Sequence, residues 1–200
     1  MQNSMRPRRV HSAVLFSVLS TLVMGALSGC MAAPDSAPVT SAAPVAEATA
    51  TPTDTPPVFA SNDEALAAAE DAYSEYQVMS NKIAHEGGAE AQRISEYTVG
   101  EVLESELATY ERMSTDKIHL VGDLAFDSFT LQSADLSSGD VIAYVCLDVA
   151  QTDVIDAAGA SVIPAGRPDR YPLQVSLLHD SSANRLFVEK SDSWSGSNFC

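Results

Sequence analysis

The acidic residue Asp148 stands within a stretch, residues 141–150, that is otherwise apolar. A carboxylate in such surroundings is costly unless it is hydrogen-bonded or paired, and one whose charge is disfavoured by burial can serve as a general base. His119 alternates with apolar neighbours in a short stretch upstream, so it could complete a His–Asp dyad with Asp148. These two residues are the candidate catalytic pair.

The alternative interpretation gives both residues a structural role. Asp148 would accept hydrogen bonds from the C-terminal tail or pair with an arginine such as Arg170, and His119 would be solvated. The sequence contains no Gly-x-Ser-x-Gly elbow, His-Glu-x-x-His, Cys-x-x-Cys, phosphate loop or calcium loop. We favour the structural role and expect no catalytic residue, no metal and no cofactor.

Four aromatic residues could line a binding pocket. Aromatic side chains at helical or strand spacing belong as a rule to the core, so a pocket and a packed core are both open interpretations. The four residues are Tyr73, Tyr76, Tyr144 and Trp194.

The first of the three cysteines, Cys30, follows a leader with three arginines near its start and an apolar run at residues 13–26. That run is too short to span a membrane. Residues 27–30, Leu-Ser-Gly-Cys, resemble the bacterial lipoprotein signal, in which the cysteine is lipidated and becomes the first residue of the mature protein. The resemblance implies a signal peptide at residues 1–29 and a lipid-anchored protein at the outer face of the cytoplasmic membrane.

The other two cysteines, Cys146 and Cys200, make an even number in an exported domain. Such a number predicts one disulfide bond. Cys146 lies within an apolar stretch and Cys200 is the last residue, so the bond would hold a tail that otherwise frays.

Residues 30–60 are rich in Ala, Pro, Thr and Ser and carry too few apolar side chains to drive burial, which predicts a disordered tether. After Cys30 the chain carries 8 basic and 27 acidic side chains, a formal charge of −19. Such a charge repels phosphate backbones and anionic headgroups, so we expect no nucleic-acid partner and membrane contact only through the lipid on Cys30.

Two helices are predicted before any strand, in a single domain at residues 61–200. Residues 61–64, Ser-Asn-Asp-Glu, form a capping box, and apolar side chains follow at helical spacing. After a short helical turn at 89–97, a second capping box at 98–101, Thr-Val-Gly-Glu, is expected to open the second helix.

From residue 118 onward the apolar period changes to two, which is typical of strands. The stretch at 126–133 changes parity and predicts a bulge, and 141–150 is apolar on both faces except for Asp148, as in a central strand. Helices followed by consecutive strands predict an α+β fold with a mainly antiparallel sheet. The expected strands are 118–120, 126–133, 141–150, 171–177 and 186–190.

The domain resembles a set of small secreted actinobacterial lipoproteins with a nuclear-transport-factor-2-like domain. The resemblance rests on residues 144–148 (Tyr-Val-Cys-Leu-Asp), 167–170 (Arg-Pro-Asp-Arg) and 194–200 (Trp-Ser-Gly-Ser-Asn-Phe-Cys). It implies N-terminal helices packed on a curved sheet, a cone-like half-barrel with a cavity between the sheet and the helices. It does not imply a function, because cones of this kind include both enzymes and proteins without chemistry.

We therefore expect a lipid-anchored cell-envelope protein with a non-catalytic domain that binds a small ligand or an envelope protein. The alternative is a small cone-fold enzyme of the isomerase, dehydratase or cyclase type that uses Asp148 and His119. The enzyme requires Asp148 and His119 to converge in an open cavity. A binding domain requires a cavity without such a pair, and an accessory domain requires neither.

Overall fold

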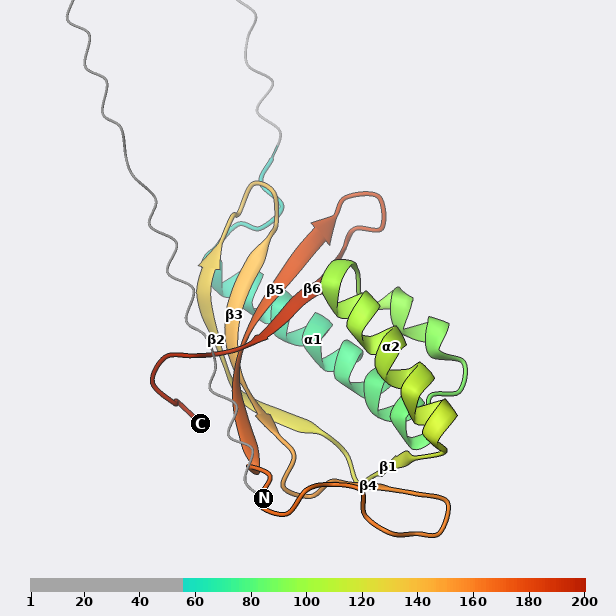
Figure 1. Ribbon diagram of the computed structural model, residues 1–200. Helices are drawn as coiled ribbons and strands as arrows, with labels where there is room; N and C mark the ends of the chain where they lie inside the picture. Colours follow the sequence, from blue (N-terminus) through green and yellow to red (C-terminus); the bar gives the residue numbers. More distant parts are fainter. Residues whose placement is uncertain (1–55) are drawn as a thin grey trace, which may run out of the picture. The chain divides into compact units, whose positions relative to one another are not determined.

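The computed structural model describes residues 56–200, and the predicted signal peptide, Cys30 and most of the tether lie outside this part. It confirms the α+β fold: two helices pack against a curved antiparallel sheet that is not closed into a barrel (Figure 1). The elements are α1 (Asn62–His85), the short helix η1 (Ala91–Glu96), α2 (Gly100–Asp116), β1 (His119–Val121), β2 (Ala125–Ala134), β3 (Val141–Asp148), β4 (Asp153–Ile155), β5 (Arg170–Asp180) and β6 (Arg185–Ser193).

Helix α1 begins with the predicted capping box. The Ser61 hydroxyl accepts a hydrogen bond from the Glu64 amide at 3.2 Å, and the Glu64 carboxylate accepts one from the Ala60 amide at 2.8 Å. Helix α1 ends at His85, and Gly88 follows shortly after it with φ +84°. The Gly88 backbone lies so close to that of Tyr110 that a Cβ would be 2.1 Å from the Tyr110 oxygen. Glycine at this position therefore permits the close approach of the end of α1 to α2.

The predicted capping box of α2 is wrong. The N-cap residue is Val99, and no side chain caps the helix. Thr98 is buried, bridges to Val188 of β6, and donates its hydroxyl hydrogen bond to the Ile94 carbonyl at 3.0 Å. Because the chain enters α2 along the sheet, Thr98 turns inward, and Glu101 instead pairs with Lys190 at 3.3 Å.

The main sheet has the order β2-β3-β5-β6, with every pair antiparallel, so β3 is central as predicted. The predicted bulge in β2 is present: the register with β3 shifts twice, and Ser128 has φ +55°. The sequence did not indicate β4, which pairs with β1 in a separate two-stranded sheet. No helix in residues 56–200 is long and apolar enough to cross a membrane.

The two faces of β3 have different neighbours. Val141, Ala143 and Val145 are fully buried in the core that the sheet forms with the helices. The alternate residues, Tyr144 and Cys146 among them, point to the opposite face, where the C-terminal segment passes over Tyr144. We call these the helix-facing side and the outer face of the sheet.

The folded packing begins slightly before Ser61. Phe59 is buried in the core, and its amide donates a hydrogen bond to the Leu136 carbonyl at 3.2 Å. Its ring also meets His179 edge-on, with ring centroids 6.3 Å apart. The chain is therefore attached to the β2–β3 turn before α1 begins.

Candidate functional site

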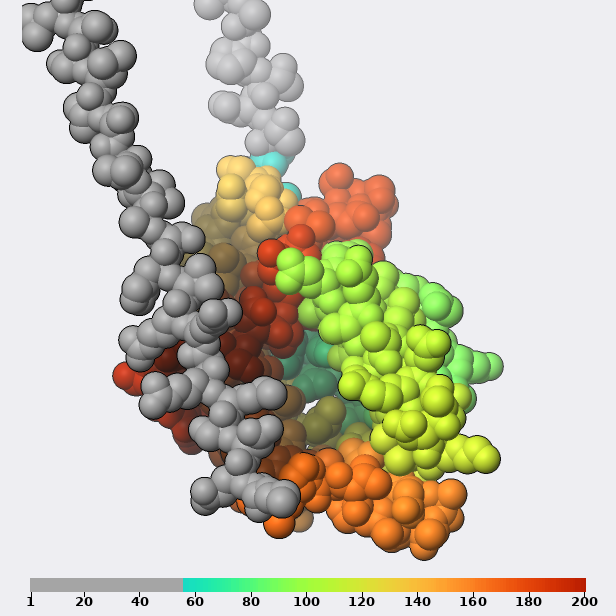
Figure 2. Space-filling model, viewed as in Figure 1, coloured from blue at the N-terminus to red at the C-terminus, as the bar shows by residue number. Residues whose placement is uncertain are grey.

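A cavity of about 260 Å³ lies between α1, α2 and the helix-facing side of the sheet, and we call it the helix–sheet cavity. Figure 2 shows this region hollowed beside α2, with atoms of α1 visible at depth. Its size suits a small molecule, since pockets for drug-sized ligands are larger. The lining residues are Tyr73, Tyr76, Gln77, Ser80, Val102, Ser105, Glu106, Leu124, Leu147, Leu173 and Ser191.

Helix α1 supplies the deepest polar groups of the helix–sheet cavity. Tyr73, Tyr76, Gln77 and Ser80 are separated by three or four residues, so they lie on one face of the helix. All four are buried. The Ser80 hydroxyl accepts a hydrogen bond from the Tyr110 phenol at 3.0 Å, which holds α2 against α1 at this end of the cavity.

Helix α2 contributes the carboxylate of Glu106. The Tyr76 phenol donates a hydrogen bond to Glu106 Oε1 at 2.5 Å. Burial raises the pKa of Tyr76 well above its usual value, and the nearby Glu106 charge raises it further. The same two causes, in the same order, raise the pKa values of Tyr73 and Tyr110. The three phenols therefore stay protonated and serve as hydrogen-bonding groups, not as bases.

Two buried residues of the cavity have polar groups without a hydrogen-bond partner in the part of the chain that the structure describes. The Tyr73 side chain is 1% exposed and Gln77 is 6% exposed. Within residues 56–200 neither the Tyr73 hydroxyl nor the Gln77 amide makes a side-chain hydrogen bond. In the same residues, every side-chain nitrogen or oxygen that is fully enclosed has a partner. Both groups must therefore reach the space of the cavity itself. Buried polar groups are almost always hydrogen-bonded, so these two are available to whatever occupies the cavity.

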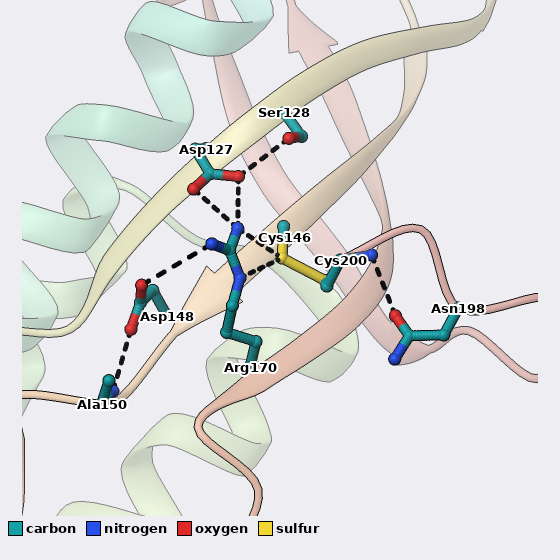
Figure 3. The surroundings of a disulfide bond; sticks show 8 residues. All are labelled: Asp127, Ser128, Cys146, Asp148, Ala150, Arg170, Asn198 and Cys200. Carbon is teal, nitrogen blue, oxygen red and sulfur yellow. Dashed lines mark hydrogen bonds and ion pairs between the residues drawn. A yellow bond between two sulfur atoms is a disulfide. The ribbon is translucent and has the colours of Figure 1, made fainter.

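The outer face carries a second cluster of polar side chains, centred on Arg170 (Figure 3). Its guanidinium donates to both oxygens of Asp127 at 2.5 and 2.6 Å and to Cys146 Sγ at 2.9 and 3.1 Å. Hydrogen bonding to Arg170 lowers the pKa of Asp127, and the same bond raises the pKa of Arg170. The cluster ties β2, β3 and β5 together.

Cys146 and Cys200 are joined by a disulfide bond, as the sequence predicts. Their α-carbons are 5.5 Å apart, within the range of protein disulfides. Cys146 is fully buried, whereas Cys200 is exposed. The bond therefore fastens the end of the chain to the central strand.

Asp148 belongs to the outer face, not to the helix–sheet cavity, because it follows Cys146 by two residues on β3. Its side chain accepts a hydrogen bond from the Ala150 amide at 2.9 Å and lies 3.9 Å from Arg170, the predicted arginine. The other expected partner is wrong: in the described residues no amide of the C-terminal tail bonds to Asp148. The tail passes over Tyr144 instead.

The candidate dyad of His119 and Asp148 is not formed. His119 on β1 lines a separate surface hollow with His85 and Lys117, and Asp148 does not line it. In residues 56–200 no hydrogen bond connects the two side chains. The reason is the pairing of β1 with β4, which removes His119 from the sheet that contains β3.

The four aromatic candidates divide between the two sides of the sheet. Tyr73 and Tyr76 line the helix–sheet cavity, with their ring centroids 5.5 Å apart. Tyr144 and Trp194 lie on the outer face and pack edge to face at 4.9 Å. The alternation of β3 turns Tyr144 outward, and the Trp194 amide bonds to the Pro172 carbonyl at 2.8 Å beyond the end of β6.

Sequence reasoning missed three polar residues of the helix–sheet cavity: Gln77, Ser80 and Glu106. A signal for them was present. Glu106 is four residues from Val102 and four from Tyr110, both on the buried stripe of α2, so it lies on that stripe. Gln77 and Ser80 interrupt the buried stripe of α1 in the same way. Polar residues inside an apolar helical stripe indicate a polar site in the interior.

Comparison with known proteins does not assign the chain to a family. No family model matches it, and no curated protein matches it. Among solved structures it is similar to the intermembrane space region of the chloroplast protein ARC6, with 10% sequence identity and a TM-score of 0.48. The match covers 64% of this chain and 95% of that chain. We therefore base the function on the geometry of the helix–sheet cavity.

Proposed function

We propose that this protein is a lipid-anchored component of the cell envelope whose folded domain binds a small ligand in the helix–sheet cavity. One observation carries the binding proposal: Tyr73 and Gln77 are buried residues, yet the Tyr73 hydroxyl and the Gln77 amide have no hydrogen-bond partner in the described residues and are open to the cavity. Apolar side chains on the opposite wall, Leu147 and Leu173, would contact the body of the ligand.

The anchor is proposed from the leader and from residues 27–30, which resemble the bacterial lipoprotein signal. Cys30 would carry the lipid at the outer face of the cytoplasmic membrane, and the Pro-rich segment would hold the domain away from the surface. The resemblance to secreted lipoproteins with nuclear-transport-factor-2-like domains supports the same location.

The binding role is preferred to the enzyme because the two candidate catalytic residues have different surroundings. Asp148 is paired on the outer face, and His119 lines a surface hollow elsewhere. A general base must come within hydrogen-bond reach of the proton it removes, directly or through one water.

Binding is tested with the full chain and benzyl alcohol, a neutral probe with an aromatic body and a hydroxyl group. Titration should shift the NMR signals of the Gln77 side-chain amide. The variant Ser105→Phe places a ring at an exposed position of the cavity lining and should weaken binding at least about tenfold. Ser74→Phe, at an exposed position of α1 outside the cavity, is the matched control and should bind as the wild type does. Equal binding by Ser105→Phe and Ser74→Phe would reject the cavity as the site.

Anchoring is tested by Cys30→Ala and cell fractionation. The variant should leave the membrane fraction and lose lipid-dependent processing. Cys200→Ala, which removes a cysteine outside the signal, is the control and should remain membrane-bound. A Cys30→Ala protein that stays in the membrane and is processed as before would rule out the anchor.

A further inference from the structure

The charges of the helix–sheet cavity indicate which class of ligand it accepts. Resting on the proposed binding function, we infer that the ligand is a small organic cation, an ammonium group on an apolar or aromatic body. The ammonium group binds Glu106, and the Tyr73 hydroxyl and the Gln77 carbonyl oxygen accept its remaining hydrogen bonds.

Glu106 is the one charged side chain among the described residues that line the cavity. It is half-buried, and no Lys, Arg or His of residues 56–200 forms an ion pair with it. The neutral Tyr76 phenol donates to Oε1, and the neutral Tyr110 phenol lies near enough to Glu106 for this carboxylate to raise the pKa of Tyr110. Neither phenol supplies a counter-charge. A carboxylate removed from water is costly without a counter-charge, and a ligand cation supplies one.

The other polar groups match the hydrogen-bonding capacity of an ammonium group. A primary ammonium has three donors and no acceptor. The Glu106 carboxylate, the Gln77 carbonyl and the Tyr73 hydroxyl provide three acceptors on the wall of the cavity. Among residues 56–200 the Gln77 carbonyl and the Tyr73 hydroxyl have no hydrogen-bond donor. Tyr73 and Gln77 are one helical turn apart on α1, so their polar groups lie on the same side of the cavity.

Aromatic rings add to the selection for a cation. Tyr73 and Tyr76 both line the cavity, and their ring centroids are 5.5 Å apart. The faces of such rings attract cations, most strongly where water is excluded.

An anionic ligand finds no counter-charge among the described residues of this cavity. None of the described lining residues is basic, and Glu106 would repel a carboxylate or a phosphate. The surplus of acidic over basic residues in the chain acts in the same direction, attracting cations and repelling anions before contact.

Three probes of nearly equal shape test the inference on the full chain at pH 7: benzylammonium, benzyl alcohol and benzoate. We expect benzylammonium to bind about tenfold or more tightly than benzyl alcohol, because a hydrogen bond to a charged group is stronger than a neutral one. Benzoate should not bind. In Glu106→Gln the preference for benzylammonium should disappear while benzyl alcohol still binds. Glu104→Gln, which removes the same charge from an exposed position of α2 outside the helix–sheet cavity, should keep the preference.

The outcomes separate the two proposals. If benzyl alcohol binds the wild type as tightly as benzylammonium, or if benzoate binds, the inference of a cationic ligand is wrong, while the proposed binding function is kept. If Glu104→Gln loses the preference as Glu106→Gln does, net charge and not the cavity carboxylate is responsible, and the inference is overturned. If none of the three probes binds, the binding function itself fails. The comparison of probes on the wild type does not depend on any variant being folded.

Discussion

Strand β3 contributes residues to both the helix-facing side and the outer face of the sheet, yet the polar groups on these two sides are arranged in opposite ways. On the outer face Arg170 binds Asp127 and Cys146, and the disulfide fastens Cys200 to the sheet. On the helix-facing side the buried residues Tyr73 and Gln77 have polar groups that are open to the cavity and have no hydrogen-bond partner in residues 56–200. The outer face pairs its polar groups with one another, and the helix-facing side leaves two of them open to the cavity.

Shifted pKa values occur on both sides, with different causes. Burial raises the pKa values of Tyr73, Tyr76 and Tyr110 on the helix-facing side. On the outer face a direct hydrogen bond with Arg170 lowers the pKa of exposed Asp127. A shifted pKa therefore indicates a functional site only together with a cavity, since ion pairs in a structural cluster produce shifts as well.

The largest expected effect concerns the outer face. Cys200→Ser removes a bond between residues 54 positions apart and should lower the free energy of unfolding by about 4 kcal/mol in the chain-entropy model. Urea unfolding without reductant measures it, with Ser197→Ala as a control in the same tail. Binding of benzyl alcohol at low urea should be unchanged, because the helix–sheet cavity is on the other side. A decrease in the free energy of unfolding of less than about 1 kcal/mol would show that fastening the tail adds little stability.

The next effect belongs to the helix-facing side and depends on pH. The folded-state pKa of Tyr76 is raised, so its contribution to stability is complete below the unfolded pKa near 10 and is lost as the pH rises above it. Between pH 10 and pH 11 the free energy of unfolding should fall by about 1 kcal/mol for this residue. Tyr76→Phe should make the alkaline decline less steep by that amount in urea titrations at several pH values. An unchanged slope would contradict the burial of an ionisable phenol.

A pair of glutamine variants compares the two sides directly. Gln77→Leu should leave stability unchanged or raise it by up to about 1 kcal/mol, because at a buried residue it replaces an amide that has no partner in residues 56–200 by an apolar group. Its outer-face counterpart, Gln174→Leu, loses the hydrogen bond to Gln132 and should change stability by less than about 0.5 kcal/mol.

Ligand binding distinguishes the two variants further. Benzylammonium should bind Gln174→Leu normally and Gln77→Leu weakly. A Gln77→Leu protein that unfolds markedly more easily than the wild type would mean that the amide has a structural role after all.

The smallest effect is the pH dependence of the outer ion pair. The folded-state pKa of Asp127 is lowered, so its contribution to stability is present above the unfolded pKa near 3.9 and is lost as the pH falls through the folded value. Asp127→Asn should therefore lower the melting temperature slightly at pH 7, less at high salt, and not at all in strong acid. An equal loss at every pH would show that the charge is irrelevant.

The sequence by itself was sufficient for most of the elements, because their signals are local. The capping box at Ser61, the parity change in β2 and the apolar run of β3 are all present in the structure. The pairing of Cys146 with Cys200, 54 positions apart, is present too, and it was predictable because only two cysteines remain besides Cys30. The signal peptide, Cys30 and the tether remain predictions from the same kind of local pattern.

Only the tertiary structure decided which groups meet. Alternation along β3 places Asp148 on the same face as Cys146, but it does not say which face the helices cover, and that choice removed Asp148 from the cavity. The partners Tyr76 and Glu106 are 30 residues apart on different helices, so their contact depends on how α1 and α2 pack on the sheet. No local period carries that information, because packing between elements is set by the whole core at once.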